Sequence, residues 1–349
     1  MTRTRRTVLL GGLVALACAA AAIPFLGWTS RHQPWEIATG WNVVPDVERP
    51  QSEELWPGAA GESPRLRWLG HAGITIEWHG QLLVTDPNLS DRCSVSARTL
   101  ERVEPSWVGA VDAVLVSHAH YDHLDLPTLR SLHATKRIVI PKGARIFVPQ
   151  SVVGEAEIIE VETGDSVKVG QLTVTAVPAA HNGNRFHPLA SAIGAVGYVI
   201  SDGRNAIYVA GDTAARNDFE SIRDTYHPRV AILPIGAFLP KFPVGHFHLS
   251  PEEAVAVAKR LGVEVVVPYH FGTFRLSLDD QAIALPRFAA EAKREGVRWV
   301  MPRLLGAPGR SALRRRKERA ERRKDVSVHD LPFSSLLSPF SFALERTCA

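Results

Sequence analysis

The sequence predicts an α+β fold in which two β-sheets lie between layers of helices. Short apolar runs typical of strands recur along the body of the chain, and a few capped amphipathic runs separate them. Sheets of this kind bury one face against each other and the other face against helices. The 349 residues, of which 45% are hydrophobic and 22% are charged, supply enough material for such a core.

The expected strands are short apolar runs between turn residues. Ile74–Trp78 and Gln81–Thr85 flank a His-Gly pair, which predicts a hairpin. Val111–Val116 is a continuous apolar run typical of a buried strand. The other expected strands are Leu66–Leu69, Arg137–Ile140, Glu157–Val161, Leu172–Val177, Ala195–Ile200, Ala206–Ala210, Val230–Pro234 and Val263–Pro268.

The expected helices are recognised by their start signals. Leu126–Leu132 follows Asp125, a good N-cap residue, and has a proline in its first turn. Ser250–Leu261 begins with a serine cap, a proline and two glutamates. Gln281–Glu295 is the third expected helix.

The N-terminal residues have the composition of a secretory signal. Arg5 and Arg6 precede an apolar run from Val8 to Leu26, and the pair resembles the twin-arginine export signal of bacteria. Because about 20 apolar residues span a bilayer, the run also fits an uncleaved anchor. We expect residues 1–30 to be an export signal or membrane anchor. The body would then lie in the periplasm or on the outer side of the cytoplasmic membrane.

The remaining chain divides into three segments. Residues 31–63 contain three tryptophans, which a flexible linker would lack, so we expect an extended segment that wraps the domain. Residues 64–307 form the expected catalytic domain. Residues 308–349 form a basic, poorly ordered tail, whose run 310–324 could contact anionic lipid or simply be solvated.

The formal net charge of +4 comes from the ends of the chain. The arginines near the N-terminus and the basic run near the C-terminus together exceed it, so the body is mildly acidic. A basic surface for nucleic acid is therefore not expected. The three cysteines, Cys18, Cys93 and Cys348, are too dispersed for a disulfide framework or a metal site.

The sequence SHAHYDHLD carries the strongest functional signal. It places His118, His120, Asp122 and His123 in one loop between an expected buried strand and a capped helix. Imidazole and carboxylate are suitable donors for zinc and related divalent ions. Four donors within six residues serve two adjacent metals better than one. His118 and His120 would face one ion, and Asp122 and His123 the other.

The pattern His-x-His-x-Asp-His resembles the signature of the metallo-β-lactamase superfamily. Three later residues match the superfamily's order, each at the end of an expected strand: His181, Asp212 and His270. The resemblance implies an αββα sandwich of two mixed sheets flanked by helices.

The same resemblance implies a ligand set for two zinc ions, although Mn²⁺ or Fe²⁺ would also fit. The first ion would be held by His118, His120 and His181, and the second by Asp122, His123 and His270. Asp212 would bridge them, and a metal-bound water or hydroxide would be the nucleophile. Asp125 would either orient a ligand histidine or only cap the helix.

Further stretches resemble one branch, which contains the phospholipase D that hydrolyses N-acyl-phosphatidylethanolamine and its bacterial relatives. These are Trp68–Ile74, Thr85–Pro87 and the segment from Gly236 to Ala254. The resemblance implies phosphodiester hydrolysis, with Asp122 and His248 as catalytic residues and His248 assisting the leaving alkoxide. An apolar mouth for acyl chains could be formed by residues that would otherwise pack in the core, namely Phe238, Leu239, Pro240, Phe242 and Phe247.

Two other functions remain open at this point. The same branch resembles lactone hydrolases, which would predict a polar pocket with little aromatic lining. A non-catalytic binding protein stabilised by metal is a different class of function. The sequence determines neither the substrate nor the oligomeric state.

Overall fold

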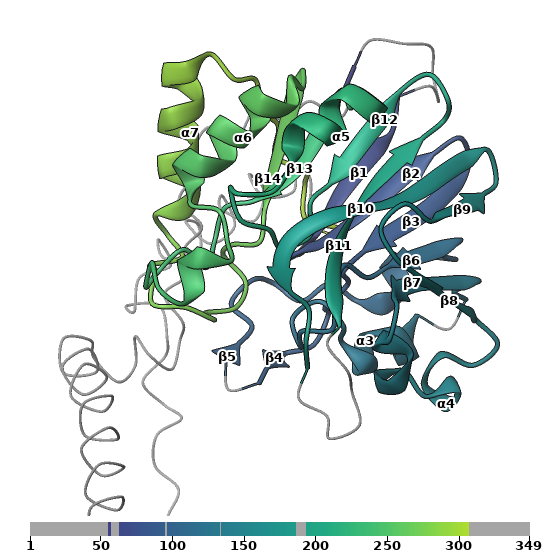
Figure 1. Ribbon diagram of the computed structural model, residues 1–349. Helices are drawn as coiled ribbons and strands as arrows, with labels where there is room; N and C mark the ends of the chain where they lie inside the picture. The colour runs from purple at the N-terminus through teal and green to yellow at the C-terminus, as the bar shows by residue number, and fades with distance from the viewer. Residues whose placement is uncertain (1–54, 57–62, 95, 133, 186–192, 307–349) are drawn as a thin grey trace, which may run out of the picture. The chain divides into compact units, whose positions relative to one another are not determined.

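The computed structural model describes residues 55–56, 63–94, 96–132, 134–185 and 193–306. The expected export segment and basic tail lie outside these residues. Two six-stranded sheets form the centre, with helices on their outer faces (Figure 1). The predicted α+β sandwich is confirmed. Within the described part of the chain, no helix has the length and apolar character needed to cross a bilayer.

The first sheet has the order β1-β2-β3-β6-β7-β8. Its first three strands are antiparallel, and the pairs from β3 to β8 are parallel. Apolar residues of β6 and β7 pack outward against two short helices, α3 and α4. The bounds are β1 Arg65–Gly70, β2 Gly73–Trp78, β3 Gln81–Thr85, β6 Ala113–Leu115, β7 Arg137–Pro141, β8 Glu157–Val161, α3 Leu126–Ser131 and α4 Gln150–Val153.

The second sheet has the order β14-β13-β12-β11-β10-β9. Strands β9 to β12 are antiparallel, and β12 to β14 are parallel. Helices α5, α6 and α7 lie beside this sheet in Figure 1. The bounds are β9 Ser166–Val169, β10 Leu172–Asn182, β11 Gly194–Ser201, β12 Ala206–Val209, β13 Val230–Pro234, β14 Val265–Tyr269, α5 Phe219–Tyr226, α6 Pro251–Leu261 and α7 Ala284–Glu295.

Short elements fill the connections. A small hairpin consists of β4 (Arg92–Cys93) and β5 (Ser96–Ala97). Within the described ranges, turns of 3₁₀ helix occur at Pro105–Trp107, Ala144–Phe147 and Val244–His246. The last of these turns lies two residues before His248 and so helps to place it.

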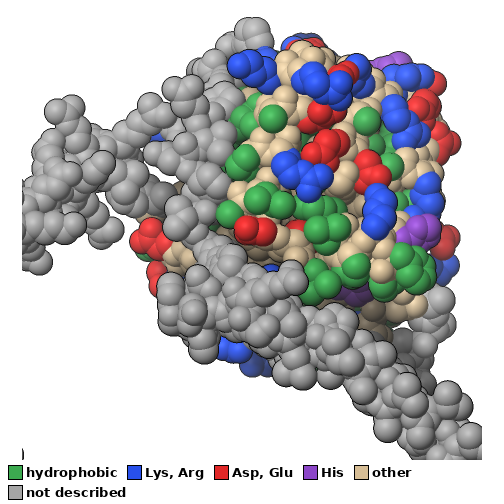
Figure 2. All heavy atoms as spheres, turned by 90° about the vertical axis from the view of Figure 1, so that its left-hand side faces the viewer, with side chains coloured by type: hydrophobic (Ala, Val, Ile, Leu, Met, Phe, Trp, Pro, Cys, Tyr) green, Lys and Arg blue, Asp and Glu red, His purple; other side chains and the backbone are tan. Residues whose placement is uncertain are grey.

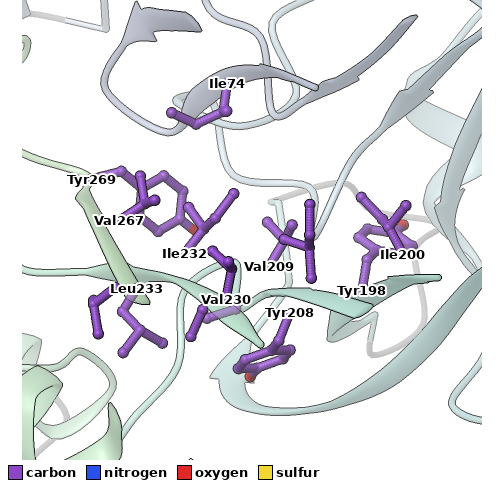
Figure 3. Packing of buried hydrophobic residues seen from close by; sticks show 14 of the residues in the cluster. Ile74, Tyr198, Ile200, Tyr208, Val209, Val230, Ile232, Leu233, Val267 and Tyr269 are labelled. Carbon is purple, nitrogen blue, oxygen red and sulfur yellow. The ribbon is translucent and has the colours of Figure 1, made fainter. Parts of the chain in front are cut away.

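The core lies between the two sheets. Figure 3 shows Ile74 of the first sheet facing side chains of the second, among them Ile232 and Tyr269. The buried hydroxyl of Tyr269 donates to the carbonyl of Gly211 at 2.8 Å, so its polar atom is satisfied. This bond also fixes the backbone next to Asp212.

Of the expected wrapping segment, the structure describes only Leu55, Trp56 and Ser63, and the first two carry the contacts with the domain. Both are buried. The ring of Trp56 meets Trp78 edge to face, with 5.6 Å between centroids, and the guanidinium of Arg229 lies 5.0 Å from Trp56. At these two positions the segment packs on the domain, as tryptophan content suggests.

The outer helices present charges of both signs. Figure 2 shows the face on the left of Figure 1, where Lys and Arg alternate with Asp and Glu. Arg287 of α7 pairs with Glu252 of α6 at 2.7 Å, and Arg260 of α6 pairs with Glu220 of α5 at 2.6 Å. Such exposed pairs contribute little to stability. Because they mix positive and negative side chains, the described residues on this face form no large patch of a single charge.

Most expected elements are present, and the differences have local causes. β10 extends to Asn182 instead of ending at Val177, with a register irregularity between Pro178 and Asn182. His181 is therefore the second-last residue of this strand and does not lie in a loop after it. Helix α5 was not expected, because it buries only Phe219 and Ile222 and so lacks a long apolar stripe.

Candidate metal centre

The loop between β6 and α3 places four candidate donors at the end of a buried strand. His118 and His123 are buried completely, and Asp122 is nearly so. The amide of Ala119 donates to the carbonyl of Gly183 at 3.1 Å, which ties the loop to the second sheet's β10–β11 connection. Rigid placement of this kind lets short side chains aim at a common centre.

The second sheet supplies the other candidates at neighbouring strand ends. His181 lies at the end of β10, Asp212 follows β12, and His270 directly follows β14. His270 has a φ of 62°, an uncommon conformation for a residue other than glycine. The backbone is thus bent to turn this imidazole towards the centre. All seven residues predicted as ligands converge on one place.

One donor group consists of His118, His120 and His181, whose ligand atoms lie within 4.8 Å of one another. The Nδ1 atom of His120 lies 2.9 Å from Nε2 of His118 and 3.3 Å from Nε2 of His181. The Oδ2 atom of Asp212 lies 3.9 Å from Nε2 of both His118 and His181. This is the trio that the resemblance to the metallo-β-lactamase superfamily implied for a first ion.

A second donor group contains Asp122, His123 and His270 together with His71, and two further groups each include Asp212. Nε2 of His123 and of His270 lie 3.5 Å and 3.4 Å from Oδ2 of Asp122, and each lies 3.2 Å from an oxygen of Asp212. A tetrahedral zinc with bonds of about 2.0–2.2 Å has edges of about 3.3–3.6 Å between its donors. The spacing therefore fits a metal, and Asp212 faces both groups.

Several buried atoms in the cluster also lack a hydrogen-bond partner among the described residues. They include Nε2 of His123, Nε2 of His270 and Oδ1 of Asp212. Leaving a buried polar atom unpaired costs about 1–3 kcal/mol. Coordination would satisfy these atoms, so the chemistry of the donor set fits a metal centre as well as its spacing does.

Burial keeps most of the imidazoles available as neutral donors. It lowers the pKa of His118 well below the usual value, with further lowering from His123 and His181. Burial likewise lowers the pKa of His181 to about 4, although Asp212 opposes the shift. Neutral imidazole is the form that binds metal.

On the other side of the cluster, the carboxylates raise the pKa of a neighbouring imidazole instead. Burial lowers the pKa of His270, but Asp212 and Asp122 outweigh it and raise the value to about 9. Burial would raise the pKa of Asp212, yet His270 and His123 hold it well below its usual range. Two ionised carboxylates thus supply negative charge for cations in a buried site.

Hydrogen bonds on the far side of three of the rings, those of His118, His123 and His181, fix the tautomers of these histidines. Nδ1 of His123 donates to Asp86 at 2.9 Å, and Nδ1 of His118 contacts Oγ of Ser117 at 2.9 Å. Nδ1 of His181 donates to the carbonyl of Phe247 at 2.9 Å. In each case the lone pair of Nε2 points at the cluster, which is the usual support for a metal-binding imidazole.

Asp86 was not among the residues expected to shape the site. It follows β3 and accepts from the amide and the hydroxyl of Ser117, both at 2.7 Å, in addition to His123. By contrast, Asp125 accepts from the amide of Thr128 at 3.1 Å and contacts no candidate ligand. Of the two roles considered for Asp125, the structure shows the helix cap.

His71 is a second residue that sequence reasoning missed. Its Nε2 atom lies 2.9 Å from Oδ2 of Asp122, and it belongs to the group with His123 and His270. Its backbone has a φ of 49° and is held by Oγ1 of Thr273, 2.6 Å from the His71 amide. The only signal in the sequence is a histidine between glycines in a tight turn.

A cavity of about 480 Å³ opens over the cluster. Its wall includes His248, whose Nδ1 donates to the carbonyl of Val244 at 2.8 Å and whose Nε2 lies 3.2 Å from Oδ2 of Asp212. The other residues around it are Cys93, Ser94, His120, Tyr121, Asp122, His181, Asn182, Asn184, Arg185, Asp212, Ala237, Pro243, Val244, Phe247, His270 and Leu276.

The expected apolar mouth is present only in part. Phe247 lines the cavity, whereas Phe238 is buried in the core and Phe242 is 79% exposed. Leu239 and Pro240 do not line the cavity either. The loop has no regular period, so its sequence did not reveal which side chains face inward.

The fold and the convergent histidines and aspartates define a class, the metal-dependent hydrolases with two facing sheets. The model of the Beta-lactamase superfamily domain matches residues 83–271, more than half of the chain. This chain belongs to the metallo-β-lactamase superfamily, and it is a metal-dependent hydrolase of that fold.

The proteins similar to this chain include two relatives and one solved structure. An uncharacterized protein of Mycobacterium tuberculosis is 34% identical over 256 residues, covering 69% of this chain and 68% of the relative. A metal-dependent hydrolase of Methanopyrus kandleri is 33% identical over 214 residues, covering 60% of this chain and 85% of the relative. The solved metallo hydrolase of Ignicoccus hospitalis has a TM-score of 0.53 and 24% identity, covering 69% of this chain and 95% of its own, and so shares the fold.

The contact between His71 and Asp122 leads to a test. His71→Ala removes a hydrogen bond to a candidate ligand, so we expect one of two metal equivalents to bind about 10–100-fold more weakly. Metal content measured by mass spectrometry after dialysis against graded chelator would show this loss. The matched control is His79→Ala, because His79 lies on the β2–β3 turn and pairs with Asp202 instead. Equal retention of metal by both variants would contradict the role of His71.

Proposed function

We propose that the protein is a zinc-dependent phosphodiesterase of the phospholipase D type that acts on N-acyl-phosphatidylethanolamine-like lipids. The observation that carries this proposal is the pair of donor groups facing Asp212 at the base of one cavity. Two ions held side by side suit the hydrolysis of a phosphodiester better than one. The ligands proposed for them are His118, His120, Asp122, His123, His181, Asp212 and His270.

The chemistry divides between the metals and the chain. Zinc, when bound, lowers the pKa of water and polarises the phosphoryl group. The water oxygen would add to phosphorus and release one proton to solvent, the bond from phosphorus to the leaving oxygen would break, and the leaving oxygen would take up one proton in return. The negative charges of Asp122 and Asp212 would offset the positive charge of the ions. Nε2 of His123 and of His270 lies 3.2–3.5 Å from the oxygens of these two carboxylates.

His248 is placed to supply that proton. It lines the cavity, its Nδ1 atom is anchored to Val244, and its Nε2 atom faces Asp212. In its protonated form it carries a proton on Nε2 that can pass to a leaving alkoxide in the cavity. A ring that is fixed through Nδ1 and lies in the cavity wall with Nε2 beside Asp212 suits such a proton transfer.

The surroundings of the cavity support a substrate with apolar parts. Pro243, Val244, Phe247 and Leu276 form part of its wall. The neighbouring Phe242 and Leu278 are well exposed, and the amide of Leu278 donates to the carbonyl of Leu239 at 3.1 Å, which joins the two loops. Apolar walls suit acyl chains better than the small polar substrates of the lactone hydrolases considered above.

A substrate panel tests the reaction class. Zinc-loaded protein is expected to release the phosphatidic acid product from N-acyl-phosphatidylethanolamine vesicles and 4-nitrophenolate from bis(4-nitrophenyl) phosphate. Product release would be followed by mass spectrometry and absorbance. Asp212→Asn is the control, because it removes a charge that faces both donor groups and should abolish turnover. Turnover of lactones alone would replace the proposal with lactone hydrolysis.

His248→Ala tests the proton donor separately. We expect kcat to fall about 10²–10⁴-fold, as is typical when general acid–base catalysis is lost. Metal content should stay near that of the unaltered protein, measured on the same samples. An unchanged rate would remove His248 from the mechanism, and a loss of metal would make it a ligand instead.

We also propose that residues 1–30 direct export, by a cleaved signal or a retained anchor, and so bring the enzyme to membrane lipid. The support is the arginine pair followed by the apolar run. Intact mass of the protein isolated from the bacterial envelope should match either the full chain or one shortened near Ala19–Ala22. Recovery of the full chain from the cytoplasm only would contradict export.

A further inference from the structure

Arg185 lines the cavity above the donor groups, and it is the one lysine or arginine among the described residues that do so. It is largely buried, with 9% of its surface exposed. Burying a cation is costly unless it is paired or put to use. The position of this guanidinium therefore calls for an explanation.

The guanidinium is held rigidly at the edge of the metal-binding loop. Its Nε donates to the carbonyl of Ala119 at 2.7 Å, and Nη2 donates to the carbonyl of Leu124 at 2.6 Å. Its carbon lies 4.0 Å from the centroid of the Tyr121 ring and 5.6 Å from that of Phe147. The fork is thus fixed before any ligand arrives, which reduces the entropy cost of binding one.

These contacts do not neutralise the positive charge. Both bonds end on backbone carbonyls, and no carboxylate of the described residues forms an ion pair with Arg185. Burial lowers the pKa of Arg185, but a guanidinium remains protonated in proteins. The remaining N–H groups of the fork have no partner among the described residues, and two planar N–H groups match the oxygens of a phosphate or carboxylate.

We propose that Arg185 is a specificity-determining residue that recognises a negatively charged oxygen of the substrate, in a phosphate or carboxylate. The inference rests on the proposed function, because it assigns a substrate class to the same cavity. The metal groups would select the bond that is cleaved, and Arg185 would select anionic over neutral esters. Asn182 and Tyr121 beside it add uncharged polar groups to this wall.

A purely structural role is the competing explanation, since Arg185 also joins both ends of the metal-binding loop. That role predicts loss of metal when the side chain is shortened or neutralised. Recognition of an anion predicts a change of substrate preference with metal content unaltered. The two roles therefore predict different metal contents, and metal content can be measured without any turnover.

The test compares two esters that share a leaving group and differ in charge. They are bis(4-nitrophenyl) phosphate, which is anionic, and its methyl triester, which is neutral. For Arg185→Gln in the zinc-loaded full chain, we expect KM for the diester to rise about tenfold, because a hydrogen bond to a charged group is lost. We expect kcat/KM for the triester to change less than about twofold. Arg185→Lys should restore part of the preference, because it keeps the charge and loses the fork.

Arg216→Gln is the matched control. Arg216 also donates to a backbone carbonyl, that of His246, and its guanidinium lies 5.2 Å from the Phe247 ring, but it does not line the cavity. Its substitution should leave both esters and the metal content unchanged. An equal loss on both esters in Arg185→Gln, or a loss of zinc, would overturn the proposal.

Binding of inorganic phosphate separates this proposal from the proposed reaction. If the unaltered protein cleaves neither ester, the phosphodiesterase assignment fails by itself. The affinity of the zinc-loaded protein for phosphate, measured by titration calorimetry, then tests the role of Arg185 independently of any reaction. A roughly tenfold weaker affinity in Arg185→Gln supports anion recognition, and an unchanged affinity overturns it.

Discussion

The carboxylate of Asp212 is the group on which the geometry of the centre depends. It is buried, and it lies 3.2 Å from nitrogen atoms of His123, His248 and His270. An isolated buried carboxylate would be expensive, so the imidazoles around it are required for stability as well as for binding. The same field explains why His270 gains basicity while His118, farther from the charge at 3.9 Å, loses it.

The sheet order brings these groups together. Strands β12, β13 and β14 run parallel in the second sheet, so Asp212 after β12 and His270 after β14 lie at the same edge, and the loop after β6 of the first sheet meets them there. The buried hydroxyls of Tyr198 and Tyr269 lie just behind this edge and donate to the carbonyls of Val116 and Gly211. These two bonds hold the backbone just before His118 and just before Asp212, and so help to fix both donors.

Much of this centre could be predicted from sequence because its strongest signal is local. The loop from His118 to His123 displays four donors in six residues, and the later ligands each follow an apolar run. His71 and Asp86 could not be found in this way. Their roles arise from the β1–β2 turn and the end of β3 lying against a loop more than thirty residues away in the chain, at Asp122 and Ser117. Likewise, the burial of Phe238 and the exposure of Phe242 depend on packing that an irregular loop does not encode in any period.

The donors come from both sheets, and this has a consequence for the molecule as a whole. His71 and the loop after β6 belong to the first sheet, whereas His181, Asp212 and His270 belong to the second. Ions bound between the two sheets would link them. They would stabilise the folded state by mass action, because the unfolded chain cannot bring the same ligands together. Loss of metal would then weaken the packing of the two sheets on each other and also remove activity. The supply of metal would therefore govern both the lifetime of the folded protein and its reactivity.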